Sequence, residues 1–123
     1  MSKELIWFIP AIAIALCIFA LSTFLAFPIQ AEGVNHLDKW EHTFAYFVLS
    51  FSFLLAFKKS ERLTSKISLL VLFISGAYGL SLEFVQFQFF EYRVFEWYDA
   101  LANILGAVLG YLVFLLLNKV ISV

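Results

Sequence analysis

Carboxylate and amide side chains are grouped within an otherwise apolar stretch of the chain, residues 82–106. Glu83 and Gln86 lie near its start, and Asp99 and Asn103 lie near its end. A carboxylate can donate or accept a proton during catalysis, and amides and carboxylates together can bind a polar ligand. Because each such group is costly in apolar surroundings, its presence indicates either a functional site or a structural pairing.

A second polar group lies earlier in the chain, in the segment "LDKWEHTFAY", residues 37–46. Asp38, His42 and Tyr46 are spaced four residues apart, so they share one face of a helix. Histidine is a frequent general acid or base, and Lys39 beside it could bind an anion. Both polar groups therefore need helices that bring them to one place.

The composition indicates that those helices lie in a bilayer. Of the 123 residues, 63% are hydrophobic and only 14% are charged, and the mean hydropathy is +0.96. The length allows one domain, residues 1–123. The strand-type alternation of a membrane barrel is absent, so we predict an all-α integral membrane four-helix bundle. The expected helices span approximately residues 5–27, 38–57, 67–90 and 99–118. The first block is longer than the apolar region of a secretory signal, and we expect it to be a membrane helix.

The positive charges predict the orientation of the bundle. Six of the eight Lys and Arg residues lie before the first helix, between the second and third, or after the fourth. These six are Lys3, Lys58, Lys59, Arg62, Lys66 and Lys119. By the positive-inside rule, both the N- and C-termini are cytoplasmic. The connections at residues 28–42 and 88–99 then face outward, and the two polar groups meet at the outer end of the bundle.

Glycines in the third and fourth helices predict close helix contacts. Gly106 and Gly110 form a small-xxx-small pattern, and Gly76 and Gly79 share a face with Glu83. Close contact between the third and fourth helices would bring Glu83 near the polar start of the fourth.

Structural roles could account for part of the polar set. Asp38 and Asp99 could be helix N-caps, and we expect this role for at least one of them. Glu83 could form an ion pair with Arg93 that only holds the outer loop in place. The aromatic residues near these positions suit an interfacial belt, and Cys17 suits a small apolar residue of the first helix.

In combination, "DKWEHTFAY", "EFVQ" and the polar residues that follow them resemble the VanZ-like family. These are small bacterial membrane proteins named for a member associated with resistance to teicoplanin. The family pattern contains Asp-Lys-x-x-His-x-x-x-Tyr, then Glu-x-x-Gln, an Arg, and Asp-x-x-x-Asn-x-x-Gly. It falls here on Asp38, Lys39, His42, Tyr46, Glu83, Gln86, Arg93, Asp99, Asn103 and Gly106. Where family members often have Pro-Gly before the Arg, this chain has Glu91 and Tyr92.

The resemblance implies a multi-pass protein of the bacterial cytoplasmic membrane with a role in the cell envelope. It also favours a working role for the polar residues as a set. The expected ligand-binding residues are Asp38, Lys39, His42, Tyr46, Glu83, Gln86, Arg93, Asp99 and Asn103. If the protein is an enzyme, His42, Glu83 and Asp99 are the expected catalytic residues, and Arg93 or Lys39 would bind an anionic group.

Several other chemistries are disfavoured by the sequence. No G-x-S-x-G nucleophile motif, recognised zinc motif, phosphate loop or nucleic-acid patch occurs. Asp38, His42, Glu83 and Asp99 could hold a metal, but such mixed sets more often form hydrogen-bond networks, so we predict neither a metal nor a cofactor. The basic segment Lys58 to Lys66 suits contact with anionic lipids.

Three functional classes remain. We favour an outward-facing pocket that binds an amphiphile, such as a lipid-linked cell-wall precursor or a lipoglycopeptide, with a link to glycopeptide resistance. The alternative is a membrane enzyme that modifies a lipid or precursor headgroup. A transporter is disfavoured because no inverted repeat is evident. Membrane lipids are expected partners, and the sequence leaves open whether the protein forms a homo-oligomer.

Overall fold

The structure is a computed structural model that describes residues 3–23, 36–89 and 97–121. A short 3-10 helix, η1 (Leu5–Phe8), leads into α1 (Ile9–Thr23). It is followed by α2 (His36–Lys59), α3 (Ser65–Phe89) and α4 (Trp97–Ile121). The described residues contain no strand. The expected all-α fold class is confirmed.

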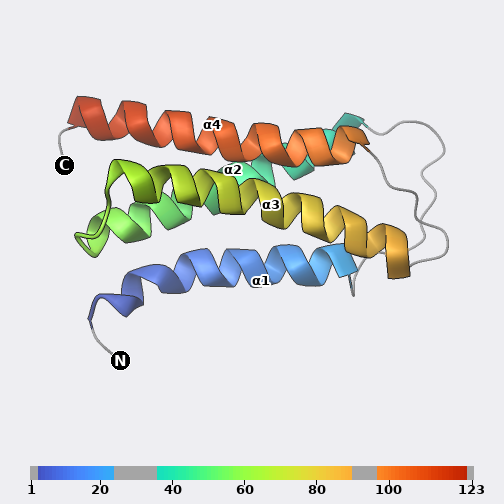
Figure 1. The fold of residues 1–123 in the computed structure, drawn as a ribbon, viewed down its shortest axis with the longest axis horizontal. Helices are drawn as coiled ribbons and strands as arrows, with labels where there is room; N and C mark the ends of the chain where they lie inside the picture. The colour runs from blue at the N-terminus through green and yellow to red at the C-terminus, as the bar shows by residue number, and fades with distance from the viewer. Residues whose placement is uncertain (1–2, 24–35, 90–96, 122–123) are drawn as a thin grey trace.

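The helices form an up-and-down bundle with both termini at one end (Figure 1). The connection between α2 and α3 lies at that same end, which we call the terminal end. Helices α2 and α4 run in the same direction and make the most extensive contact, while α3 packs on both. Helix α1 packs on α2 and α3. The relative positions of the predicted site residues are therefore set chiefly by the packing of α2, α3 and α4.

All four helical segments are long and apolar enough to cross a membrane. The candidate spans are Leu5–Thr23, Trp40–Lys59, Ser65–Gln88 and Trp97–Val120. Many large apolar side chains on their outer faces are exposed, as expected where lipid is the solvent. The chain is thus a multi-pass membrane protein.

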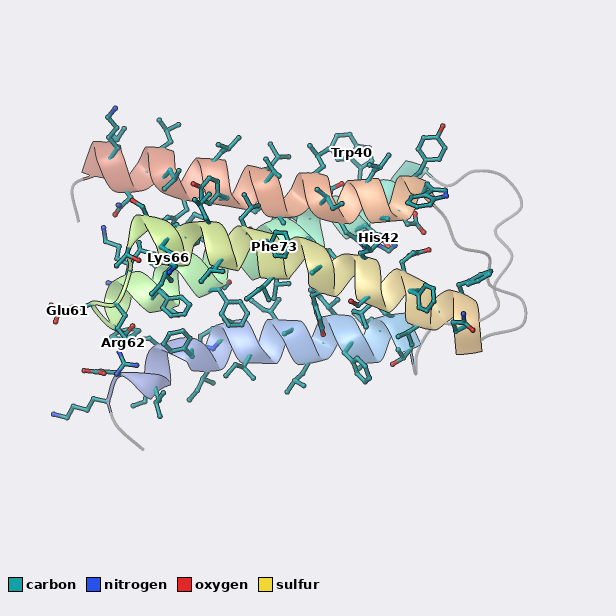
Figure 2. All side chains as sticks on the ribbon, viewed as in Figure 1. Trp40, His42, Glu61, Arg62, Lys66 and Phe73 are labelled. Atoms are coloured by element: carbon teal, nitrogen blue, oxygen red, sulfur yellow. The ribbon has the colours of Figure 1, made fainter. Side chains whose placement is uncertain are left out.

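Basic residues gather at the terminal end, where Arg62 and Lys66 lie far from His42 (Figure 2). Lys58 and Lys59 are in the last turn of α2, and Lys119 is in the last turn of α4. Positive charge at a helix C-terminus complements the helix dipole. The structure thus agrees with the charge pattern on which the orientation rests, and cytoplasmic termini stay a prediction.

Glycines allow α2 and α4 to touch through their backbones. A Cβ built on Gly106 would lie 2.1 Å from the carbonyl oxygen of Thr43. One turn further on, a Cβ on Gly110 would lie 2.5 Å from the carbonyl oxygen of Phe47. The hydroxyl of Ser50, on the same helix as Phe47, donates a hydrogen bond across the contact to the Ala107 carbonyl, 3.0 Å away. The small-residue pattern therefore serves helix packing, as predicted, and its partner is α2.

Candidate functional site

Six predicted site residues whose side chains are described lie on α2, α3 and α4 toward the end opposite the termini. This polar cluster consists of His42, Tyr46, Glu83, Gln86, Asp99 and Asn103. All of them are buried except His42, whose side chain is 22% exposed. His42 is therefore the member of the cluster with the most accessible side chain.

Asn103 fixes the orientation of the histidine ring. Its side-chain nitrogen donates a hydrogen bond to the Gly79 carbonyl, 3.3 Å away. Since a carbonyl can only accept, the amide oxygen of Asn103 must face His42, whose Nδ1 lies 2.8 Å from it. Nδ1 therefore carries a hydrogen and donates it. In the neutral ring, Nε2 is then the nitrogen with the lone pair.

Nε2 of His42 faces the buried carboxylate of Asp99. The distance from Nε2 to Oδ2 of Asp99 is 3.9 Å, which is longer than a direct hydrogen bond. A protonated ring would form an ion pair with this carboxylate. With a neutral ring, both atoms are acceptors, so a hydroxyl or ammonium group placed between them could donate to either.

Glycine also brings α3 against this part of the cluster. A Cβ on Gly79 would lie 2.7 Å from the Cβ of Asn103 and 3.0 Å from the ring edge of Tyr46. The ring of Tyr46 therefore lies beside Asn103, and Tyr46 is close enough to Glu83 for a charge interaction. The expected approach of α3 to α4 at Gly79 is confirmed.

Glu83 is only 4% exposed although it lies inside the α3 span. Insertion scales put the cost of a carboxylate at the centre of a membrane helix at about 2.5 kcal/mol or more. Such groups usually face the interior of a bundle and mark a polar site. The burial of Glu83 follows that pattern.

Gln86 connects the polar cluster to α1. Its side-chain nitrogen donates to the carbonyl of Ser22, 2.6 Å away. Ser22 is in the last described turn of α1, so this bond ties α3 to that part of the helix. The sequence predicted Gln86 as a ligand residue, and the structure gives its amide nitrogen a bracing role as well.

The N-cap interpretation of the two aspartates is wrong in position. Helix α4 begins at Trp97, so Asp99 lies in its first turn, and α2 begins at His36, so Asp38 lies two residues inside it. A carboxylate in the first turn still interacts favourably with the helix dipole. The side chain of Asp99 points inward and is buried, where it faces His42.

Three expected site residues are not placed by the structure. The side chains of Asp38 and Lys39 and the whole of Arg93 lie outside the described residues. The pairing of Glu83 with Arg93 and the anion-binding roles of Lys39 and Arg93 therefore stay predictions. Among the side chains that are described, no three His, Cys, Asp or Glu residues are close enough together to hold a metal ion.

Sequence reasoning missed Tyr78, which lies next to the cluster. Its hydroxyl donates to the Ala15 carbonyl at 2.6 Å, and its ring packs on Tyr46 with centroids 6.4 Å apart. A tyrosine in the middle of a membrane helix needs a hydrogen-bond partner, and this was the available signal. Tyr78 connects the cluster to α1.

The arrangement defines a class: a four-helix membrane protein in which a partly exposed His contacts buried Asn and carboxylate side chains, toward the end of the bundle opposite both termini. The VanZ/LLP1 family profile matches residues 3–118, nearly the whole chain. The chain belongs to the VanZ/LLP1 family, which confirms the resemblance seen in the motifs.

The chain is also similar to an uncharacterized protein of the fission yeast Schizosaccharomyces pombe. The two are 36% identical over 109 residues, which cover 88% of this chain and 64% of the yeast protein. The chain thus spans less than two thirds of the length of that relative. No solved structure matches the chain.

Proposed function

We propose that this protein binds the headgroup of a membrane amphiphile at the polar cluster, on the outer side of the membrane. The observation that carries the proposal is the orientation of His42, which is fixed through Nδ1 by Asn103 while Nε2 faces a buried carboxylate. Fixing a partly exposed imidazole in one orientation within a membrane span is costly, which favours a role of the ring in ligand binding. Simple bracing of α2 on α4 is already achieved by the glycine contacts and the Ser50 hydrogen bond.

The chemistry of the cluster indicates which headgroups suit it. A neutral His42 and the Asp99 carboxylate are both acceptors, so hydroxyl or amino groups of a ligand would match them. Lys39 and Arg93, if they lie nearby as the sequence predicts, would bind a phosphate or carboxylate of the same headgroup. A zwitterionic or hydroxylated phospholipid headgroup combines these features.

The yeast relative bears on the choice of ligand. If this protein resides in a bacterial membrane, as the resemblance implies, a ligand class shared by bacterial and eukaryotic membranes would suit both proteins, which favours a phospholipid-type amphiphile. Binding of a lipid-linked cell-wall precursor or of teicoplanin is the narrower form of the proposal, with residence in a bacterial cytoplasmic membrane. In that form, loss of the cluster would change glycopeptide susceptibility.

The tautomer of His42 favours one second candidate, an enzyme that acts on the headgroup. A neutral imidazole with its lone pair on Nε2 is a general base, and Asp99 would stabilise the imidazolium formed after proton transfer. Glu83 would then be the second acid or base. The ligand is the same in both candidates, and turnover distinguishes them.

The experiment compares binding with folding. Purified protein is titrated with phospholipids of different headgroups, a lipid-linked wall precursor and teicoplanin, and the complexes are counted by native mass spectrometry. We expect His42→Gln and Glu83→Gln each to weaken binding of the preferred amphiphile by about tenfold or more while the melting temperature is kept. The double variant should be no weaker than either single one, because residues acting as a unit are not additive.

Glu41→Gln is the matched control, because Glu41 is exposed beside His42 on the same helix. It should bind like the unchanged protein. If His42→Gln and Glu83→Gln retain full binding of every amphiphile, or lose melting temperature and binding together, the cluster braces the bundle and the proposal is wrong. Release of a modified headgroup that depends on His42 would establish the enzyme.

A further inference from the structure

An apolar crevice of about 300 Å³ lies among α1, α2 and α3, on the terminal side of the polar cluster. Its wall includes Ala15 of α1, Phe53 and Phe57 of α2, and Ile74 and Tyr78 of α3. Three separate helices thus contribute to it. A second apolar hollow beside Lys66 is lined, among the described residues, by α3 alone.

A pair of packed tyrosines links the wall of the crevice to the polar cluster. Tyr78 lines the crevice, and its ring packs on that of Tyr46, which belongs to the cluster. Tyr46 also shares a buried core with Leu49, another residue of the crevice wall. An amphiphile with its polar group at the cluster would therefore have to pass these two rings to place its apolar part in the crevice.

The wall of the crevice is almost entirely apolar. The Tyr78 hydroxyl donates its hydrogen bond to the Ala15 carbonyl. The remaining side chains of the wall are apolar apart from the buried Ser75. Along α2 the crevice extends from Leu49 to Phe57, about 12 Å at the rise of a helix. The occupant must be apolar, slender and directed along the bundle axis.

We infer that the crevice binds one acyl chain of the amphiphile whose headgroup contacts the polar cluster. The inference rests on the proposed function for the headgroup, and the bilayer supplies the chain at the required depth. A lipid held in this way would be gripped at both its polar and its apolar part. Selectivity would then depend on the acyl chain as well as on the headgroup.

The test uses two photoactivatable probes with a diazirine in the middle of the chain. One is a phospholipid, and the other is a fatty alcohol that lacks the phosphate headgroup. Each is bound to the purified full-length protein in detergent and irradiated, and the labelled residues are mapped by mass spectrometry. We expect label at Phe53, which an excess of unlabelled phospholipid should suppress.

The matched pair of variants is Ala15→Phe and Ala13→Phe, the same change two residues apart on α1. Ala15 lines the crevice, whereas Ala13 is exposed on the outer face of the helix. Filling the crevice should lower labelling at Phe53 by both probes about fivefold or more, and Ala13→Phe should leave it unchanged. Melting temperatures of both variants verify folding.

The outcomes separate the crevice from the headgroup site. If His42→Gln lowers labelling by the phospholipid and leaves labelling by the fatty alcohol unchanged, both proposals hold. If Ala15→Phe lowers labelling and His42→Gln affects neither probe, the acyl site stands and the headgroup site is wrong. Label that is spread over all lipid-facing helices and insensitive to Ala15→Phe would overturn the inference. Crosslinking of crevice residues to a second copy of the chain would overturn it also.

Discussion

Gly106 is the position where one methyl group should do the most damage to the site. In Gly106→Ala, the new Cβ would lie 2.1 Å from the Thr43 carbonyl oxygen and 2.9 Å from its carbon. Both are backbone atoms of α2, so no side-chain rotation can relieve the contact. Reaching an ordinary contact of 3.4 Å requires α2 and α4 to separate by roughly 1 Å.

That separation has a definite cost. It would stretch the hydrogen bond from Ser50 to Ala107 and the one between His42 and Asn103, both of which cross between these helices. Overpacking of this kind destabilises a protein by about 1–3 kcal/mol, and the backbone contact puts Gly106→Ala at the upper part of that range. Binding of the amphiphile should weaken together with stability.

Gly76→Ala is the matched control. Its new Cβ would meet only Ile104 Cγ1 at 3.8 Å, an ordinary contact. Because both variants gain the same helix propensity, the difference between them isolates the packing term. The free energy of unfolding is measured by steric trapping in mixed micelles, where Gly106→Ala should be less stable than Gly76→Ala by about 2 kcal/mol. Equal stability of the two variants would refute the close contact of α2 and α4.

Three further predictions concern orientation and bracing. In a Cys17-free background, a cysteine at Gly33 should react with an impermeant thiol reagent on intact cells, whereas one at Glu61 should react only after lysis; the reverse pattern would place the termini outside. Gln86→Leu should cost about 1 kcal/mol by leaving the α1 carbonyl without its donor, while the exposed Gln88→Leu should not, as measured by the same unfolding assay. Glu4→Gln breaks only an exposed ion pair, so its effect on unfolding should stay below about 0.5 kcal/mol, and a larger loss would show that this contact is worth more than surface pairs usually are.

The number and type of the helices could be predicted from the sequence because a bilayer requires long apolar helices and offers few alternatives. Residue spacing also placed Asp38, His42 and Tyr46 on one helix face. Spacing does not say which neighbour a face meets, however, because that depends on how each helix is rotated and tilted. The tight contact of Gly106 with α2 therefore had to come from the structure.

The roles within the cluster were equally dependent on three-dimensional contacts. Nothing in the spacing of Asn103 says that its amide nitrogen is used by Gly79, and only that bond decides the tautomer of His42. Likewise, Gln86 fits the family pattern as a site residue, and its bond to Ser22 of α1 could not be foreseen. Motif and composition identify the members of the site, and the packing of the helices assigns their tasks.

The proposed binding site requires above all that His42 present Nε2 toward the ligand. Nitrogen-15 NMR of histidine-labelled protein in lipid nanodiscs measures this directly, with His36→Gln used to assign the two histidines. The expected spectrum has a protonated Nδ1 and an unprotonated Nε2 for His42, and Asn103→Ala should abolish that preference. Addition of the preferred amphiphile should shift the Nε2 resonance and leave Nδ1 nearly unchanged. A neutral ring protonated at Nε2, or an Nε2 resonance that no amphiphile shifts, would contradict the proposed site.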